Sequence, residues 1–583
     1  MNEVSMAERD RQLLLDAQRQ GWGTTIGAYV KLSGPGWLQS AITLGGGSLA
    51  GALFLGVLGG TSMLWLQLLA IAMGVVMLSA ISYVTLSTGR RPFETINSEI
   101  NPALGWGWLS ATILANIIWC MPQFALCYTA LDKNLVPVFS GSTGGLGPET
   151  GVKFISSALL LAAASIIVGL NARRGVSARI FDWFLKALVG MIVICFFGVV
   201  ILLALRGRLN FEQIVAGFIP DFRQWTQPSG QIGALLAGLS PEVQRFWSDK
   251  IVLNQRTVMI AAAATAVGIN MTFLLPYSML GRGWDKPFRG LARFDLSTGM
   301  AIPYILVTSC VVIASAATFH AQIDENLASH DPLTMQESPS FAKIRPALLE
   351  RLAKISEPPA GVQAVSGTTS DDSQLASLAA MPEVEKRLAL SLVQRNAFEL
   401  SQTLAPLLGE RLANLVFGLG VFGMGFSTII ILMLINGYAF QEMCDRPGGR
   451  VPFVAGCAVA GIAGASWPYF WAGDTQFWLA IFASTFGMML LPIAYVTFFL
   501  MMNSQRILGD EKPRGVAMLV WNTLMIISIA GAVVAAATAI YDKAMDREHP
   551  AAFYAIMALI VVYGLLVGGG FIARRDKCGV QAA

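Results

Sequence analysis

The sequence predicts an all-helical integral membrane protein of about twelve spans, built as two inverted repeats of five helices plus two additional helices. Three observations lead to this prediction. The 583 residues are 55% hydrophobic and 13% charged, with a mean hydropathy of +0.60, which lies outside the composition of soluble domains. Apolar runs of about 20 residues recur along the chain, and each could cross the ~30 Å hydrocarbon core. Two of these runs, five spans apart, carry helix breakers near their middle.

The apolar runs place the spans, and the cationic loops orient them. We expect spans at 35–58, 61–86, 108–131, 153–171, 181–205, 257–281, 295–319, 412–440, 452–471, 477–501, 516–541 and 551–573. Lys and Arg gather in the loops after even-numbered spans and at both ends of the chain. The positive-inside rule therefore places both termini in the cytoplasm, which predicts a multi-pass protein of the inner (cytoplasmic) membrane.

Long connections divide the chain into five regions. We expect a cytoplasmic N-terminal segment at 1–34, membrane helices 1–7 at 35–319 with an outer loop at 206–255, an extracytoplasmic lid at 320–411, membrane helices 8–12 at 412–573, and a cytoplasmic tail at 574–583. Within the lid, the apolar stripe from Phe341 to Ile355 and the stretch from Met381 to Leu404 predict helices. The Pro/Gly/Ser/Thr/Asp-rich segment 358–374 between them predicts a linker. A lid that packs on the spans is favoured over a gate or a partner site.

The two breaks are the strongest functional signal. The first span contains Gly45, Gly46, Gly47 and Ser48, and each glycine costs about 1 kcal/mol against Ala in a helix interior. The sixth span contains a second breaker-bearing polar stretch, 266–272. Broken helices at matching positions of two halves mark the solute site of secondary transporters. The alternative is that the glycines serve only close helix packing.

The candidate site consists of neutral groups near the two breaks. The interiors of most spans hold no charge, so substrate-binding residues are sought among neutral polar side chains and backbone groups. The candidates are Thr43, Gly45, Gly46, Gly47, Ser48, Asn116, Gln123, Gly268, Asn270 and Thr272. A metal ion would have at most Ser48 and Asn270 as side-chain ligands, with backbone carbonyls. Asn116 and Gln123 lie seven residues apart on one helix face, so they are equally consistent with hydrogen bonding between helices.

Other patterns exclude several functions. No phosphate-binding loop is present, so ATP is not a partner, and no hydrolytic or redox motif predicts an enzyme. We expect no cofactor and no nucleic-acid partner; the partners are a small ion or small molecule and the lipid bilayer. Trp119 is expected to be an interfacial anchor, and Asp295 a helix cap.

Several motifs are similar to those of one transporter family. Gly34-Pro-Gly-Trp-Leu followed by a break at Gly45 resembles the first helix of the Nramp divalent-metal transporters. Ala115-Asn-Ile with Gln123-Phe-Ala resembles helix 3 of that family, and further similarity lies in helix 8 (Phe417-Gly-Leu-Gly) and at the end of helix 10 (Leu491-Pro). The resemblance implies a leucine-transporter-type fold and secondary transport of a metal ion.

The departures from the family pattern fall on its functional residues. Gly45 and Ser48 stand where the family has its metal-binding Asp and Asn, and Asn270 falls approximately at the metal-binding Met. The helix 3 acids linked to proton movement are replaced by Asn116, Gln123 and Leu126, and Thr272 replaces the helix 6 His. The chain resembles a divergent Nramp-related transporter whose usual ligands are replaced.

Three functions remain open on this sequence. The first is alternating-access transport of a metal cation, with a hydrated ion such as Mg²⁺ favoured over Mn²⁺ or Fe²⁺ because no anionic or soft ligand set converges. The second is transport of a neutral, zwitterionic or carboxylate-bearing organic solute, whose carboxylate would suit a half-helix N-terminus. The third is a receptor or scaffold that does not transport.

Overall fold

The structure is a computed structural model that describes residues 6–136, 149–171, 176–355, 371–470, 476–544 and 550–582. These residues form helices and turns and contain no strand. Ten helical segments among them are long and apolar enough to cross a membrane. One of the ten, Gly46–Thr88, joins the end of the first predicted span to the second through the short η1 turn (Gly60–Met63), and Met557–Ala573 is a shorter apolar helix. These two features account for the difference from the twelve expected spans.

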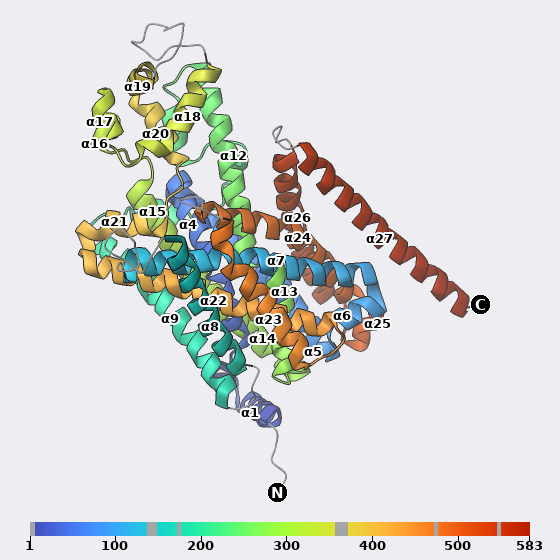
Figure 1. Cartoon of the computed structure of the whole chain (residues 1–583). Helices are drawn as coiled ribbons and strands as arrows, with labels where there is room; N and C mark the ends of the chain where they lie inside the picture. Colours follow the sequence, from blue (N-terminus) through green and yellow to red (C-terminus); the bar gives the residue numbers. More distant parts are fainter. Residues whose placement is uncertain are drawn as a thin grey trace.

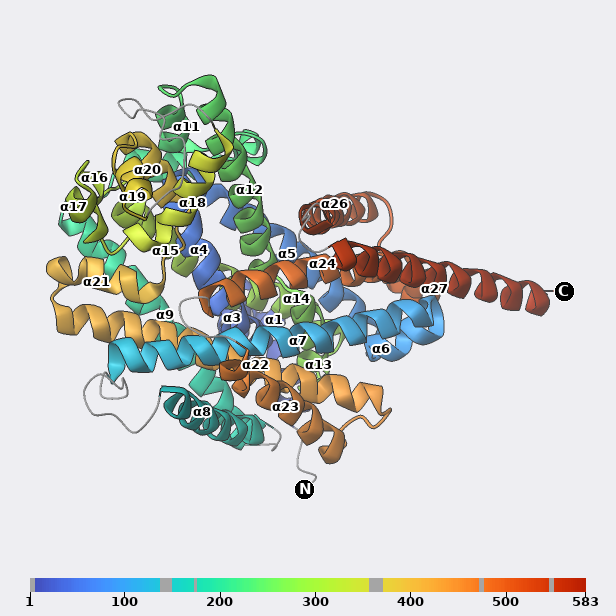
Figure 2. The same ribbon diagram turned by 45° about the horizontal axis from the view of Figure 1, so that its top comes forward.

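The membrane helices follow the predicted order. They are α3 (Pro35–Thr43), α4 (Gly46–Gly59), α5 (Leu64–Thr88), α7 (Pro102–Ala130), α8 (Glu149–Asn171), α9 (Val176–Leu205), α12 (Pro241–Ala266), α13 (Ile269–Gly281), α15 (Ile302–Phe319), α22 (Glu410–Met443), α23 (Arg450–Ala465), α24 (Gln476–Asn503), α26 (Val516–Ala544) and α27 (Pro550–Ala582). Both predicted breaks are confirmed: the first span is split into α3 and α4, and the sixth into α12 and α13. Helix α27 reaches away from the bundle (Figures 1 and 2).

A buried carboxylate fixes the N-terminal half of the first span. Asp295, at the end of α14 (Arg289–Asp295), is 1% exposed and accepts hydrogen bonds from the backbone N–H groups of Gly34 (3.0 Å) and Gly36 (2.7 Å). A Cβ on Gly36 would lie 2.1 Å from the Asp295 carbonyl oxygen, so only glycine permits this approach. The expected cap at Asp295 therefore exists, but it caps α3, about 260 residues away, rather than its own helix.

The lid lies at the end of the molecule opposite the N-terminal helix α1 (Met6–Gln20), as Figure 1 shows. It contains α16 (Glu325–Ala328), α17 (Pro332–Gln336), α18 (Phe341–Lys354), α19 (Asp371–Ala379), α20 (Glu383–Ser391) and α21 (Ala397–Leu408). The helix expected from Phe341 is confirmed as α18, whereas the stretch expected from Met381 forms two helices, α20 and α21, because Asn396 caps a new helix. Most of the predicted linker 358–374 lies outside the described residues.

The lid is docked on an outward extension of the sixth span. Helix α12 begins at Pro241, inside the segment 206–255 that was expected to be a connection, which also contains α10 (Phe211–Ala216) and α11 (Gly230–Leu236). Trp247 of α12 donates a hydrogen bond from Nε1 to Glu385 (2.9 Å), and Glu385 also pairs with Arg351 (2.7 Å). Both members of that ion pair are 2% exposed, so loss of either one would leave an uncompensated buried charge.

Candidate functional site

The first break needs glycine for space rather than for backbone conformation. None of Gly45, Gly46 and Gly47 has a positive φ, and Gly45 is extended (φ −101°, ψ −177°). A Cβ on Gly45 would lie 2.6 Å from Thr428 Oγ1, and one on Gly46 would lie 2.9 Å from a methyl carbon of Leu126. The three glycines thus let α7, α12, α22 and α24 approach the broken helix closely, so the break and the close packing occur together.

The freed backbone of the first break is satisfied by side chains. The N–H of Gly46, at the start of α4, donates to Gln123 Oε1 of α7 (2.8 Å), and the Ser48 hydroxyl donates to the Thr43 carbonyl. The Ala41 carbonyl accepts from the hydroxyls of Ser427 (2.8 Å) and Thr428 (3.2 Å) of α22. Unwound backbone is tolerated at membrane depth only under such protection.

The second break is organised around a methionine. Val267 and Gly268 are extended, and the Gly268 N–H lies 3.4 Å from Met271 Sδ. The Thr43 hydroxyl donates to the same sulfur (3.5 Å), so Met271 links the two breaks. A Cβ on Gly268 would lie 2.3 Å from the ring of Trp119, which explains the glycine there.

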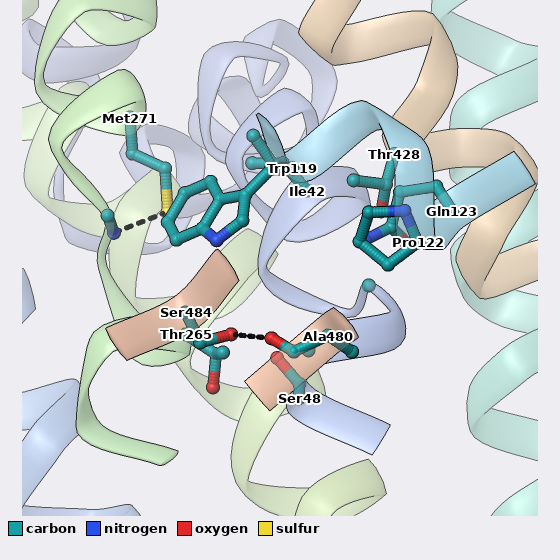
Figure 3. Close-up of a pocket in the computed structure, with 13 residues that line it drawn as sticks. Ile42, Ser48, Trp119, Pro122, Gln123, Thr265, Met271, Thr428, Ala480 and Ser484 are labelled. Atoms are coloured by element: carbon teal, nitrogen blue, oxygen red, sulfur yellow. Dashed lines mark hydrogen bonds between the residues drawn. The ribbon is translucent and has the colours of Figure 1, made fainter. Parts of the chain in front are cut away.

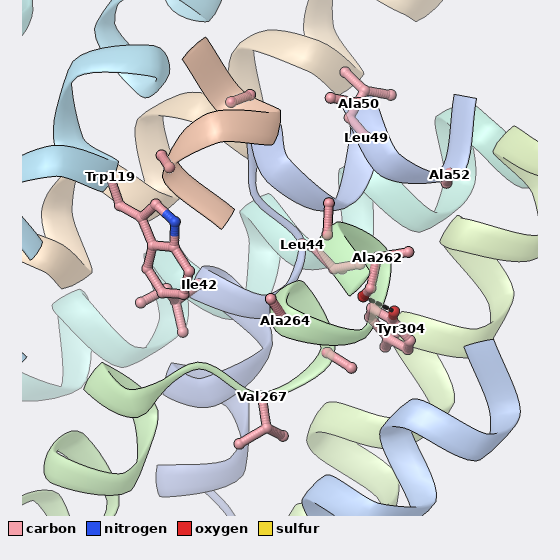
Figure 4. Close-up of a cluster of buried hydrophobic side chains, with 14 of the residues drawn as sticks. Ile42, Leu44, Leu49, Ala50, Ala52, Trp119, Ala262, Ala264, Val267 and Tyr304 are labelled. Atoms are coloured by element: carbon pink, nitrogen blue, oxygen red, sulfur yellow. Dashed lines mark hydrogen bonds between the residues drawn. The ribbon is translucent and has the colours of Figure 1, made fainter. Parts of the chain in front are cut away.

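A small cavity of about 30 Å³ lies between the two breaks (Figure 3). This volume holds about one or two water molecules. The lining comes from both broken helices and from α7, α22 and α24: Ile42, Gly45, Gly47, Ser48, Trp119, Pro122, Gln123, Thr265, Gly268, Met271, Thr428, Ala480 and Ser484. None of these residues carries an ionisable side chain, and no group of three or more His, Cys, Asp or Glu occurs within the described part of the chain. Apolar side chains, including Leu44, Val267 and Tyr304, pack around the breaks (Figure 4).

Seven of the ten predicted residues lie at this cavity or directly beside it. Five line it: Gly45, Gly47, Ser48, Gln123 and Gly268. Thr43 and Gly46 are joined to it by their hydrogen bonds to Met271 and Gln123.

Three predicted residues are engaged elsewhere. Asn116 donates to Asn436 Oδ1 of α22 (2.9 Å), which is the interhelical hydrogen bond considered as its alternative. Thr272 accepts from Trp108 Nε1 (2.9 Å), and Asn270 Oδ1 accepts from the Met271 N–H (2.9 Å). Of the two side chains considered for a metal ion, only Ser48 lines the cavity.

Sequence reasoning missed the cavity residues whose positions depend on packing. Met271, which was not among the candidates, brings one sulfur to the cavity, and Trp119, expected as an interfacial anchor, lines the cavity instead. Thr265 and Ser484 were also missed. The polar residue Thr265 directly precedes the second break, a signal that could have identified it.

A second, larger cavity adjoins the first on the side of the lid. It has a volume of about 380 Å³ and shares Pro122 and Ala480 with the inner cavity. Its lining reaches from Gly46 to the lid helices α18 and α21. We call it the outer vestibule; its charged lining residues are Asp132, Lys133, Lys153, Lys343 and Glu399.

Comparisons with known proteins agree with this architecture. A crystal structure of the Eremococcus coleocola manganese transporter, bound to an aromatic bis-isothiourea compound, shares the fold with a TM-score of 0.55 at 13% identity, covering 94% of each chain. A histidine-to-alanine mutant of that transporter gives a TM-score of 0.47 at 14% identity, over 94% of this chain and 96% of the other. MhsT in complex with L-phenylalanine gives 0.42 at 12% identity, over 84% of this chain and 98% of the other. Among curated protein sequences, none matches significantly.

A match to a protein-family model identifies the family to which this chain belongs. The Natural resistance-associated macrophage protein-like (Nramp) family matches residues 36–336 and 387–540, which include both breaks and leave out most of the lid. The chain therefore belongs to the Nramp family of metal-ion transporters and is a multi-pass membrane protein rather than an enzyme.

Proposed function

We propose that this protein transports a hydrated divalent cation of the Mg²⁺ type by alternating access, through the cavity between the two breaks. The observation that carries the proposal is the neutral lining of that cavity, whose polar side-chain groups are hydroxyls, the Gln123 amide, the Trp119 indole N–H and one thioether. Mn²⁺ and Fe²⁺ are selected by nitrogen, sulfur and carboxylate ligands. Mg²⁺ gives up its waters reluctantly and is held largely through them, so amides, hydroxyls and carbonyls suit it.

The helix ends support a cation at this position. Helices α3 and α12 both end at the breaks, so their last carbonyls and the negative ends of their dipoles face the region of the cavity. Met271 supplies one soft ligand atom, but a thioether is uncharged and does not replace the missing carboxylate.

The sizes of the two cavities suggest a route. Six waters at about 30 Å³ each occupy about 180 Å³, which fits the outer vestibule but not the inner cavity. We infer that the ion reaches the vestibule with its hydration shell. The two inverted repeats would then move apart and let the ion enter the inner cavity. With the N-terminal segment in the cytoplasm of an inner-membrane protein, the lid covers the outer entrance.

A carboxylate-bearing organic solute is the second candidate, and a specific observation favours it. The Gly46 N–H lies at the N-terminus of α4, where a solute carboxylate could take the place of the Gln123 oxygen to which this N–H now donates. Lys133, Lys153 and Lys343 line the vestibule and would attract an anion.

Flux in liposomes separates these functions. Purified protein is reconstituted, and uptake of Mg²⁺, Mn²⁺ and a set of amino acids is compared with protein-free liposomes. The proposal predicts Mg²⁺ uptake well above Mn²⁺ and no amino-acid uptake. Amino-acid uptake without cation flux would establish the second candidate, and uptake of nothing would favour a receptor or scaffold.

A further inference from the structure

We propose that Asp132 forms an outer cation site in the vestibule, at which the Lys133 ammonium group occupies the place of the cation until one arrives. This inference rests on the proposed function in one respect only, which is that the cargo is a divalent cation. The ligand is a hydrated divalent cation, received here before it moves to the neutral cavity.

Asp132 carries a carboxylate oxygen without a hydrogen-bond partner in the described part of the chain. Asp132 lines the vestibule and is only 5% exposed. Its Oδ2 lies 3.1 Å from Lys133 Nζ, but its Oδ1 is buried without a hydrogen-bond partner among the described residues. A buried acceptor without a partner is costly, and more so if it is charged, so this oxygen is suited to a ligand or to the water around one.

The two members of the Asp132–Lys133 ion pair differ in their exposure to solvent. The Asp132 side chain is 5% exposed, whereas the Lys133 side chain is 47% exposed. A lysine has a long flexible stem and can move its charge into water at little cost, but the buried carboxylate cannot follow. An arriving cation can therefore displace Lys133 and take over the compensation of Asp132.

Asp132 is held in place. It lies in a short π-helical turn, η3 (Leu131–Leu135), closed by a hydrogen bond from the Val136 N–H to the Leu131 carbonyl (2.7 Å). Asn134 in the same turn donates to Asn414 of α22 (3.3 Å), and the turn packs closely on Gly418. The turn continues α7 at its C-terminal end, so these contacts hold Asp132 at the rim of the vestibule.

The other charges of the vestibule are already compensated or differently placed. Glu399 pairs with Lys343 (2.8 Å) and with Arg395 (3.0 Å), so its carboxylate is held by two cations of the lid. Lys153 is 8% exposed and lies 6.0 and 5.8 Å from the ring centroids of Tyr128 and Trp467. Within the part of the chain that the structure describes, Asp132 is thus the vestibule carboxylate that keeps one oxygen, Oδ1, without a hydrogen-bond partner.

Two substitutions with opposite expected effects test the site. Calorimetry on the purified full-length protein measures binding of Mg²⁺ and of hexaamminecobalt(III), an inert complex that resembles a hydrated cation. Asp132→Asn should weaken binding of the cobalt complex by about tenfold or more, and Lys133→Gln should strengthen it by about threefold or more, because the competing ammonium is gone. Lys343→Gln is the matched control, since Arg395 still pairs with Glu399 when that lysine is removed; it should change binding much less than Lys133→Gln does.

The outcomes separate the outer site from the transport proposal. If the cobalt complex binds with the expected dependence on Asp132 and Lys133 but Mg²⁺ is not taken up, the outer site stands and the proposed cargo is wrong. If Mg²⁺ is transported but neither substitution changes binding or the KM for uptake, the outer site is refuted. If Asp132→Asn does not fold, Lys133→Gln decides alone: tighter binding supports the site, and unchanged or weaker binding overturns it.

Discussion

The inner cavity and the outer vestibule adjoin at Pro122 and Ala480, yet they differ in volume and in the charge of their linings. The inner cavity holds about 30 Å³ and is lined only by neutral groups, whereas the vestibule holds about 380 Å³ and is lined by five charged side chains. Charge at the centre of a bilayer is expensive, and charge near water is not. We propose that this chain recognises its cargo at the breaks with backbone groups and neutral dipoles, and keeps the charged groups of the transport route in the vestibule.

The largest expected effect comes from placing a side chain at the first break, beside the inner cavity. Gly46→Val should abolish flux while the protein still reaches the membrane, because a β-branched side chain would collide with Leu126 and Gln123 and restrict the break. Uptake in liposomes is the measurement. Gly198→Val in α9 is the matched control, since a Cβ there meets nothing within 4 Å. Normal transport by Gly46→Val would mean that the break is only a packing device.

Placing a carboxylate in the inner cavity should give it a charged lining, as the vestibule has, and should tighten its binding of Mn²⁺. Gly45 has a backbone conformation open to any residue, and its Cβ would meet Thr428 Oγ1, so Gly45→Asp is combined with Thr428→Ala to make room. Calorimetry should show Mn²⁺ binding at least about tenfold tighter than in the wild type. Thr428→Ala alone serves as the control, and the absence of any gain in the double variant would place the ion elsewhere.

A smaller effect is expected at the inner end of the first span. Asp295→Asn replaces the buried charge that caps α3, which should weaken that helix by about 1 kcal/mol and speed hydrogen exchange of its amides by about fivefold. Hydrogen exchange read by mass spectrometry measures the amides of α3 separately from those of α4. Asp285→Asn, at a more exposed carboxylate on the same side, should leave α3 unchanged. Unchanged α3 exchange in Asp295→Asn would argue against the cap.

The smallest expected effect is that of pH. The inner cavity holds no titratable side chain, and burial lowers the pKa of His320, at the outer end of α15, below its usual value near 6.5. The imidazole is therefore neutral at pH 7 and stays neutral as the pH rises. We expect Mg²⁺ uptake at fixed voltage to change little with an imposed pH gradient. One proton entering per ion, read by an internal pH dye, would contradict this expectation.

The sequence was sufficient for the architecture because the bilayer imposes length and composition on each span. The two breaks fall where glycine and polar residues interrupt apolar runs, and the structure confirms both. Gln123 lines the cavity, whereas Asn116, predicted on the same helix face, bonds Asn436 instead.

Contacts between distant elements could not be predicted in this way. Asp295 caps a helix about 260 residues away, and Met271 points its sulfur at Thr43, because helix packing and not local pattern decides both. Asn270 and Thr272 do not line the cavity, because Thr272 accepts from Trp108 and Asn270 from the Met271 N–H, contacts that the local pattern does not show. The role proposed for Asp132 depends on the π turn that holds it in the vestibule, and the hydrophobic periodicity of the sequence does not indicate such a turn.

Competition between two ions tests the central claim most directly. Mg²⁺ uptake into liposomes containing the wild-type protein is measured with and without an equal concentration of Mn²⁺ outside. A neutral, water-retaining site predicts that Mn²⁺ lowers Mg²⁺ uptake by no more than about half, because the two ions compete at best as equals. Abolition of Mg²⁺ uptake by micromolar Mn²⁺ would contradict the account and would reveal an anionic or soft ligand set at the breaks.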